Sequence, residues 1–315
     1  MKKIIVCMIL VMSLLTGCGG AGSSGDDGKV KVGYVINNLN DTFQTYVLET
    51  AKEYAKENDI ELLVENPEED TIRQLDMTNS LIQKGVKALI VVPTDTSAMD
   101  PITKAAQEAG IPLAYVNRNP FAGKEDSIPD NVFYVGVDEK SAGVMQMEYI
   151  GDLLGGQGGV AVLMGILGNE GTVKRTEGVK EALETKFPSM QLLATETGNW
   201  KRDQGLALTE NYLTTYGDKL NAVIANNDEM ALGAIQALKT AGKLEQIKVV
   251  GIDAITDALD SIEAGELSAT VFQDPAQGRA AIEILDKVLK GENQEEKVVY
   301  IPVKLVTKDN YQEFK

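Results

Sequence analysis

The feature that most constrains the fold of this chain is an alternation of two kinds of segment from Val30 to the C-terminus. Short apolar runs rich in Val, Ile and Leu are separated by amphipathic stretches of helical length. The apolar runs predict strands at 30–36, 60–65, 88–93, 112–117, 131–137, 160–165, 190–196, 222–227, 248–253 and 268–273. The stretches between them predict helices at 44–58, 70–84, 99–109, 172–186, 202–216, 228–241 and 256–264. Nearly continuous apolar strands joined by crossover helices are typical of a parallel sheet covered on both faces.

The same layout occurs twice along the chain, first up to about residue 137 and again from about residue 160. No repeat is visible at the level of individual residues. A chain of 315 residues is long enough for two domains. We therefore expect an α/β protein made of two doubly wound, Rossmann-like domains, each built on a parallel sheet.

Composition and motifs exclude several functional classes. The formal net charge of -17 leaves no basic patch for phosphate contacts, so we expect no nucleic-acid partner. The chain contains no histidine, which removes the usual Ser-His and Cys-His nucleophile systems and the commonest zinc ligand. The run GGQGG at 155–159 precedes a predicted strand instead of following one, which indicates a turn and not a dinucleotide loop. We therefore expect no catalytic residues, no cofactor and no metal site.

Polar residues collect at the carboxyl ends of the predicted strands. They are Asn37, Asn38, Asn117, Arg118, Asn226, Asn227, Asp253 and Gln273. Ligands of open α/β sheets bind outside these ends, so the residues form one site if both sheets face a common cleft. The alternative is that each residue serves a turn or a helix cap.

The stretch AVIANNDEMALGAIQAL at 222–238 illustrates both interpretations. Asp228 stands at the start of a predicted helix, where a carboxylate accepts hydrogen bonds from the first backbone N–H groups, so we expect it to cap the helix. Asn226 and Asn227 lie where a ligand would be met, and an amide offers both a donor and an acceptor. Trp200, the only tryptophan, is either a core residue or an aromatic platform for a sugar ring at the cleft edge.

The N-terminus has the features of an export signal. Lys2 and Lys3 precede an apolar run that is too short to span a bilayer comfortably but suits the core of a secretory signal. The run ends at LTGC, residues 15–18, which resembles the bacterial lipoprotein box. The resemblance implies a signal peptide at 1–17, lipidation of Cys18, a flexible tether at 18–29 and anchoring on the extracytoplasmic side of the cell membrane. The alternatives are a plain signal peptide or a short anchor helix.

Seven segments together resemble the sugar-binding proteins of the ribose and galactose type that serve ABC importers. They are NNLNDTF (37–43), VVPTD (91–95), YVNRNP (115–120), KRTEGV (174–179), NNDEMALGA (226–234), VVGID (249–253) and ATVFQ (269–273). The resemblance implies two lobes joined by three crossings near Val137, Gln273 and Pro302, with the ligand cleft between them. The first lobe would comprise 30–137 and 274–301, and the second 138–273 and 302–315.

The same resemblance implies a role for individual residues. In the first lobe, Asp41 and Phe43 are similar to a hydroxyl acceptor and a stacking ring, and Asn117 and Arg118 to a polar pair. In the second lobe, Arg175 resembles an arginine that contacts ring hydroxyls, and Trp200 a second stacking ring. The polar set that completes the enclosure would be Asn227, Asp253 and Gln273. Asn226 would support Asn227, and Asn37 and Asn169 are further candidates.

Departures from the family patterns bear on the ligand. Asn117-Arg118 replaces the Asp-Arg pair of the ribose type, and Val92 replaces an amide. The histidine and the calcium loop of the glucose and galactose type are missing. This combination of features from the two types favours a hexose of the glucose and galactose type as the ligand, with a cyclic polyol such as myo-inositol as the alternative.

The implied partners are this ligand, the permease of an ABC importer and the membrane, and we expect a monomer. Three other interpretations remain. A sensory module would present a sugar-like signal to a receptor. A repressor would need a DNA-binding segment in place of the lipoprotein box. An enzyme of sugar metabolism is not supported by any catalytic pair.

Overall fold

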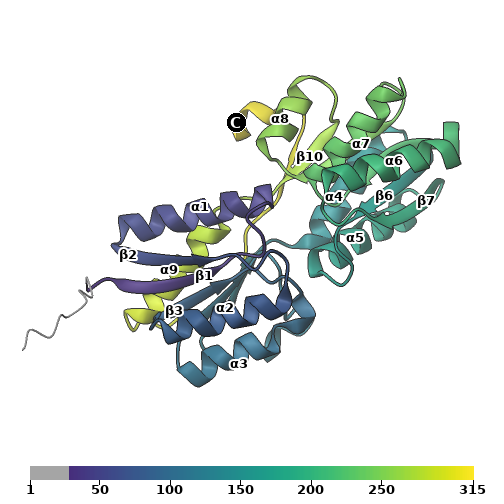
Figure 1. Cartoon of the computed structure of the whole chain (residues 1–315). Helices are drawn as coiled ribbons and strands as arrows, with labels where there is room; N and C mark the ends of the chain where they lie inside the picture. The colour runs from purple at the N-terminus through teal and green to yellow at the C-terminus, as the bar shows by residue number, and fades with distance from the viewer. Residues whose placement is uncertain (1–27) are drawn as a thin grey trace, which may run out of the picture.

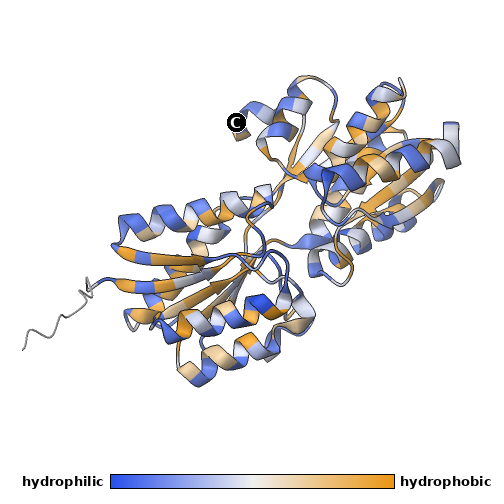
Figure 2. Ribbon diagram, in the orientation of Figure 1, coloured by the Kyte–Doolittle hydropathy of each residue, from blue (hydrophilic) through white to orange (hydrophobic). Residues whose placement is uncertain are grey.

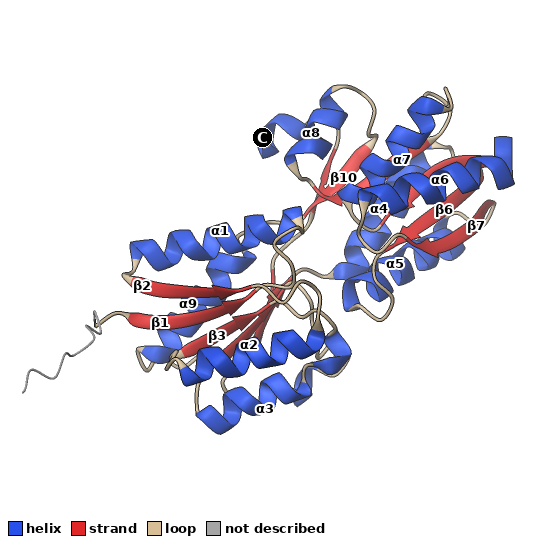
Figure 3. Ribbon diagram, in the orientation of Figure 1, coloured by secondary structure: helices blue, strands red, loops and turns tan. Residues whose placement is uncertain are grey.

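The computed structural model describes residues 28–315 and contains two six-stranded sheets, each with helices on both faces (Figure 1, Figure 3). This arrangement confirms the expected α/β fold with two doubly wound sheets. The two halves, called here the first and the second lobe, lie end to end. The expected signal peptide at 1–17, Cys18 and most of the tether lie outside the described residues. No helix within residues 28–315 combines the length and the apolar character needed to cross a bilayer.

The sheet of the first lobe is parallel throughout. Its strands in spatial order are β11 (Val298–Tyr300), β5 (Val132–Gly136), β4 (Leu113–Val116), β3 (Ala88–Val91), β1 (Val30–Val35) and β2 (Ile60–Glu65). One face is covered by α1 (Thr42–Glu57) and α9 (Gln277–Leu289), and the other by α2 (Thr71–Gln83) and α3 (Asp100–Ala109) (Figure 1). Two short 3₁₀ helices, Thr96–Ala98 and Glu125–Ser127, lie in its loops.

The sheet of the second lobe has one antiparallel edge strand, β12, which pairs with β10. Its strands in spatial order are β12 (Lys304–Val306), β10 (Ala269–Phe272), β9 (Lys248–Asp253), β8 (Leu220–Ala225), β6 (Gly158–Met164) and β7 (Met190–Thr197). On one face α4 (Glu139–Leu153) packs against α5 (Glu170–Lys186). The other face carries α6 (Arg202–Tyr216), α7 (Asp228–Thr240) and α8 (Thr256–Glu263). Short 3₁₀ helices at Gly217–Lys219 and Tyr311–Phe314 complete this lobe.

The strands are apolar because both faces of each sheet are covered. Every residue of β3, β4 and β5 is buried. The hydropathy colouring shows apolar strands inside and helices whose outer sides are polar (Figure 2). Burying one Val, Leu or Ile side chain contributes about 1.5–3 kcal/mol, so these runs hold each sheet between its helices.

The chain passes between the two sheets three times. It leaves the first sheet between β5 and α4, returns between β10 and α9, and leaves again between β11 and β12. The positions named from the family resemblance, Val137, Gln273 and Pro302, lie in these three connections. All three connections are short, and they leave the carboxyl ends of β5, β10 and β11. The carboxyl ends of the parallel strands in both sheets therefore face the space between the lobes.

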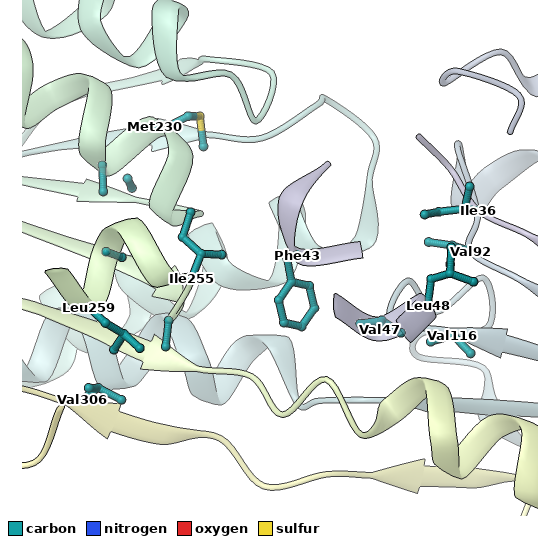
Figure 4. Packing of buried hydrophobic residues seen from close by; sticks show 14 of the residues in the cluster. Ile36, Phe43, Val47, Leu48, Val92, Val116, Met230, Ile255, Leu259 and Val306 are labelled. Atoms are coloured by element: carbon teal, nitrogen blue, oxygen red, sulfur yellow. The ribbon is translucent and has the colours of Figure 1, made fainter. Parts of the chain in front are cut away.

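Phe43 lies where the two lobes approach each other. It is buried and belongs to a hydrophobic cluster that includes residues of both lobes. In Figure 4 its ring stands between Val47 and Leu48 of its own helix on one side and Ile255 of the second lobe on the other. Phe43 therefore contributes apolar contact across the cleft.

Four helices and strands differ from the sequence expectation. No helix was expected at 139–153, yet α4 forms there, and α9 and the edge strands β11 and β12 were not expected either. The buried side of α4 is made partly of glycine and polar residues, including Gly143, Gln146 and Gly151, so its apolar periodicity is weak. The remaining helices agree with the expected ranges to within two residues at each end.

The expected role of Asp228 is wrong. The cap of α7 is Asn227, whose Oδ1 accepts a hydrogen bond from the N–H of Met230 at 3.1 Å. The buried Asp228 carboxylate instead accepts from the hydroxyl of Thr270 at 2.7 Å and from the N–H of Ile255 at 3.1 Å. Asp228 is the first residue of the helix proper, and from there its side chain joins β10 to the loop after β9.

Candidate functional site

A pocket lies between the lobes at the carboxyl ends of both sheets. It has about 340 Å³ of space between atoms, including space open to solvent. The residues that line it are Asp41, Phe43, Gln44, Asn117, Arg118, Glu139, Asn169, Gly171, Arg175, Trp200, Asn227, Asp253 and Gln273. All nine principal candidates from the sequence are therefore brought together, and Asn169 joins them. Asn37 does not line the pocket and lies behind it.

One continuous hydrogen-bond network joins the first lobe to the second through amide side chains. Gln44 Nε2 donates to Asn117 Oδ1 at 2.7 Å, and Asn117 Nδ2 donates to Gln273 Oε1 at 3.1 Å. Gln273 Nε2 then donates to Asp253 Oδ1 at 2.8 Å. The network fixes the orientation of each amide, because every donor in it meets an acceptor.

Arg118 forms the charged part of the first lobe's wall. It is buried and lies 3.7 Å from the Asp41 carboxylate and 3.4 Å from that of Glu69. Its Nη1 also donates to the carbonyl oxygen of Pro93 at 2.9 Å. Asn37 supports both carboxylates, since its Nδ2 donates to Asp41 at 3.3 Å and to Glu69 at 2.7 Å.

Arg175 is held in the second lobe by a bidentate ion pair. Its Nε and Nη2 donate to the two oxygens of the buried Glu139 carboxylate, and its Nη1 donates to the carbonyl oxygen of Asn226 at 2.6 Å. Burial alone would lower the pKa of Arg175, but the charge of Glu139 overcomes this effect and raises it. Arg175 therefore stays a cation in a fixed orientation.

Asn226 supports this wall without lining the pocket. It is fully buried, and its Oδ1 accepts hydrogen bonds from the N–H of Gly165 at 3.3 Å and from the Thr176 hydroxyl at 3.2 Å.

Trp200 faces the pocket from the loop before α6. The Cζ atom of Arg175 lies 5.6 Å from the centroid of its ring, a cation–π distance. Gly165 lies against the ring, because a Cβ built on this glycine would stand 2.0 Å from it. Asn227 Nδ2 donates to the carbonyl oxygen of Trp200 at 3.2 Å and holds the loop in place. The residue also packs against the hydrophobic cluster while it lines the pocket, and its role as a platform for a sugar ring stays a prediction.

Three polar atoms of the pocket wall are buried and have no protein partner within residues 28–315. They are Gln44 Oε1, Asn169 Nδ2 and Trp200 Nε1. A buried polar group without a partner costs about 1–3 kcal/mol. These atoms include one acceptor and two donors, which matches a ligand whose groups both donate and accept hydrogen bonds.

Two acids of the pocket wall, Asp41 and Asp253, and the nearby Glu170 have altered pKa values. Burial raises the pKa of Asp41, although Arg118 opposes the effect. Burial also raises the pKa of Asp253 well above its ordinary value, with Arg175 lowering it and Asp228 raising it. Glu170, next to Glu139, has a pKa raised to about 8 by burial and by the charge of that neighbour.

Contacts at the rim hold the two lobes together around the pocket. The Thr42 hydroxyl donates to Glu229 Oε1 at 2.9 Å, and the hydroxyls of Tyr46 and Thr256 lie 3.2 Å apart. The structure therefore has the lobes in contact, with the pocket between them.

Sequence reasoning missed Gln44, Glu139 and Gly171 as pocket residues. Gln44 had a detectable signal, because an acid followed three residues later by Gln is typical of a helix start. Glu139 and Gly171 stand in first turns of helices, and Glu139 belongs to the helix that was not expected. The part of the chain that the structure describes contains no cluster of His, Cys, Asp or Glu suited to a metal ion.

Comparison with known proteins identifies close relatives. Residues 32–293 match the profile of a family described as periplasmic binding protein domain. A putative rhizopine-binding protein of Rhizobium meliloti is 41% identical over 280 residues, which cover 88% of this chain and 89% of the relative.

Two solved structures superpose over most of the chain. An ABC transporter solute binding protein from Bacillus halodurans with bound myo-inositol has a TM-score of 0.84 and 36% identity, covering 92% of this chain and 99% of that one. An ABC transporter periplasmic solute binding protein from Actinobacillus succinogenes with bound D-allose has a TM-score of 0.84 and 29% identity, covering 90% and 100%.

Proposed function

The chain belongs to the periplasmic binding protein family, and we propose that it captures a monosaccharide or a cyclitol for an ABC importer. Members of this family bind transport substrates on the outer side of the cytoplasmic membrane, and they are not enzymes. The proposed ligand is a single six-membered ring with several hydroxyl groups. It is enclosed between the two lobes, and the closed form is the one that the permease receives.

The observation that carries this proposal is the convergence of buried polar groups from both lobes on one pocket. Each hydrogen bond between a sugar hydroxyl and the protein adds only about 0.5–1.5 kcal/mol, or about 1.5–3 kcal/mol when one partner is charged. Association itself costs about 4–15 kcal/mol. Tight binding of a hydroxylated ring therefore needs many partners and several charged ones, and the pocket supplies amides, carboxylates and two guanidinium groups.

Aromatic rings on opposite walls support a ring-shaped ligand. Phe43 comes from the first lobe and Trp200 from the second, and both line the pocket. An aromatic face packs well against the C–H face of a sugar or cyclitol ring.

The sequence patterns favour a hexose of the glucose and galactose type, with a cyclic polyol such as myo-inositol as the alternative, and the relatives include proteins solved with a ligand of each kind. The Bacillus halodurans protein was solved with myo-inositol and the Actinobacillus succinogenes protein with D-allose. The higher identity to the first of these favours the cyclitol. The two candidates share the six-membered ring but differ in the ring oxygen and in the exocyclic carbon of the hexose.

The proposal is tested by calorimetry of the exported domain with D-glucose, D-galactose, D-allose, D-ribose and myo-inositol. A ligand at 100 times its dissociation constant adds about 2.7 kcal/mol to the free energy of unfolding, so a thermal-shift screen is a suitable first step. We expect Asn227→Ala to abolish binding, while Asn293→Ala, which alters an exposed amide, leaves it intact. Equal affinity in these two variants would exclude Asn227 from the site, and no binding of any ring would refute the function.

A further inference from the structure

One acid at the contact between the lobes takes no part in the wall of the ligand pocket. Glu170 is the first residue of α5 and directly follows the pocket residue Asn169, but it does not itself line the pocket. Its carboxylate accepts a hydrogen bond from the backbone N–H of Asn119, which follows β4 in the first lobe. Because Glu170 belongs to the second lobe, this hydrogen bond joins the two lobes and requires that they stay closed.

Two tyrosines of the first lobe also lie within range of the charge of Glu170. Burial raises the pKa of both Tyr134 of β5 and Tyr300 of β11, and the Glu170 carboxylate adds to each shift. The Oε2 atom of Glu170 is buried and has no hydrogen-bond partner within residues 28–315. Separation of the lobes would therefore bring water to an oxygen that the closed protein keeps dry.

The charged groups around Glu170 do not neutralise it. Within the described chain they are Glu139 from α4, Lys174 and Arg175 from α5, and the phenols of Tyr134 and Tyr300 from the first lobe. Glu139 already engages Nε and Nη2 of Arg175 with its two oxygens, and Lys174 pairs with Glu177 at 3.0 Å. Both cations are thus occupied elsewhere, while the charge of Glu139 opposes a second negative charge beside it.

These surroundings favour the neutral form of the carboxyl group. Burial, followed by the charge of Glu139, raises the pKa of Glu170 to about 8 in the closed protein, although Arg175 opposes the shift. Glu139 belongs to the same lobe and acts in any arrangement of the two lobes. The cover provided by the first lobe is lost when the lobes separate, and water then stabilises the charged form. The pKa of Glu170 is consequently higher in the closed protein than in the open one.

We propose that capture of the ligand takes up a proton, and that this proton resides on the Glu170 carboxylate at the contact between the lobes. The inference rests on the proposed function, because closure on a ring is what buries the group. Closure converts a solvated carboxylate and a proton from water into a buried carboxylic acid, and opening returns the proton to the solvent. By linkage, the affinity is highest at acid pH and falls as the pH rises toward about 8.

Calorimetry in two buffers counts the protons that are taken up. Wild-type protein is titrated at pH 7 with D-glucose, D-galactose, D-allose, D-ribose and myo-inositol, first in phosphate and then in Tris. Tris has a much larger ionisation enthalpy than phosphate, so the difference in binding heat measures the protons that the buffer supplies. For a ring that binds, we expect uptake of about half a proton or more, and a dissociation constant about three-fold or more higher at pH 8 than at pH 6.

Variants of α5 assign the proton to its residue. Glu170→Gln keeps the shape of the side chain without a titrating group, so we expect the uptake to fall by about half a proton or more and the affinity to depend less on pH. Glu184→Gln, an exposed substitution in the same helix, should retain the uptake of the wild type. Should Glu170→Gln not fold, Glu170→Ala removes the same carboxyl group and serves the same comparison.

Two results overturn the inference and leave the proposed function standing. The first is a ring that binds to the wild type with no uptake of protons. The second is equal uptake in the wild type and in Glu170→Gln, which would assign the proton to another acid of the cleft, such as Asp41 or Asp253, whose pKa burial also raises. Absence of binding heat with all of these rings refutes both the inference and the proposed function.

Discussion

Three residues of the pocket hold backbone conformations that L-amino acids rarely adopt. The φ angles of Asn117, Trp200 and Asp253 are 66°, 65° and 125°. Asn and Asp tolerate positive φ better than most residues, but Trp does not, so its conformation depends on tertiary packing. The position of these residues after strands could be predicted from the sequence, because the apolar runs end there. The orientation of their side chains toward the pocket could not be predicted, because it follows from contacts between segments far apart in the chain.

At the same scale, Glu139 is the residue on which the geometry of Arg175 depends. Removing one partner of a buried ion pair leaves an uncompensated charge and costs about 3–5 kcal/mol. We therefore expect Glu139→Ala to lower the free energy of unfolding by this amount and to weaken ligand binding. Urea denaturation measures the first effect and calorimetry the second.

The matched control for this prediction is Glu181→Ala. Glu181 forms an exposed ion pair with Lys140 at 2.5 Å, and removing such a pair costs at most about 1 kcal/mol. A loss of stability in Glu139→Ala no greater than in Glu181→Ala would contradict the proposed dependence of Arg175 on its partner.

Buried acids predict how stability depends on pH. The pKa of Glu170 is raised to about 8 and that of Asp228 to about 7, both mainly by burial. In the unfolded chain such groups titrate near about 4. At pH values between the unfolded and the folded pKa, the folded protein binds more protons than the unfolded chain. Its free energy of unfolding therefore falls as the pH rises from about 5 to about 8. The slope is up to about 1.4 kcal/mol per pH unit for each proton.

Urea denaturation between pH 5 and pH 9 measures this slope. Glu170→Gln keeps the shape of the side chain without its charge, so we expect a shallower slope and higher stability than wild type at pH 8. Glu184→Gln, an exposed substitution in the same helix, should keep the wild-type slope. Identical slopes in wild type and Glu170→Gln would exclude this carboxyl as the source.

At the scale of elements, the strands of the two sheets were the most predictable parts. Strands such as β3 and β4 are continuous apolar runs, and α6 begins and ends where its pattern predicts. The helix α4 could not be found in this way, because it packs through glycines. The helix α9 did have a signal, since Ala281, Ile282 and Leu285 form its buried face at helical spacing.

The glycine contact between α4 and α5 gives a prediction at this scale. A Cβ on Gly143 would stand 2.0 Å from the carbonyl oxygen of Arg175, so Gly143→Ala must push the two helices apart. We expect a loss of about 1–3 kcal/mol in the free energy of unfolding, typical of overpacking, together with weaker ligand binding because Arg175 moves. Denaturant unfolding and calorimetry measure the two effects.

The control is Glu148→Ala in the same helix, whose side chain is exposed and forms an ion pair with Lys186. A surface substitution of this kind changes stability by about 0.5 kcal/mol or less. Wild-type stability in Gly143→Ala would mean that the close approach of the two helices is not required.

For the whole molecule, the resemblance of residues 15–18 to the lipoprotein box predicts that a lipid anchor at Cys18 holds the two lobes outside the cytoplasm. Each buried methylene of an acyl chain contributes about 0.8 kcal/mol, so stable anchoring requires more than one chain. We expect Cys18→Ser to abolish labelling by radioactive palmitate and to release the protein from the membrane fraction. Cys7→Ser, which alters the cysteine inside the signal, should keep both the label and the membrane location. Labelled Cys18→Ser protein would refute the anchor.

The order of the elements along the chain has a consequence for biosynthesis. The first sheet receives its edge strand β11 and its covering helix α9 only after every parallel strand of the second sheet has been made. A nascent chain that ends before Gln277 exposes the faces of α1 and β4 that α9 covers in the finished molecule. Neither lobe can therefore complete its fold before the other during translation. Folding is completed only after about the last tenth of the polypeptide has been synthesised.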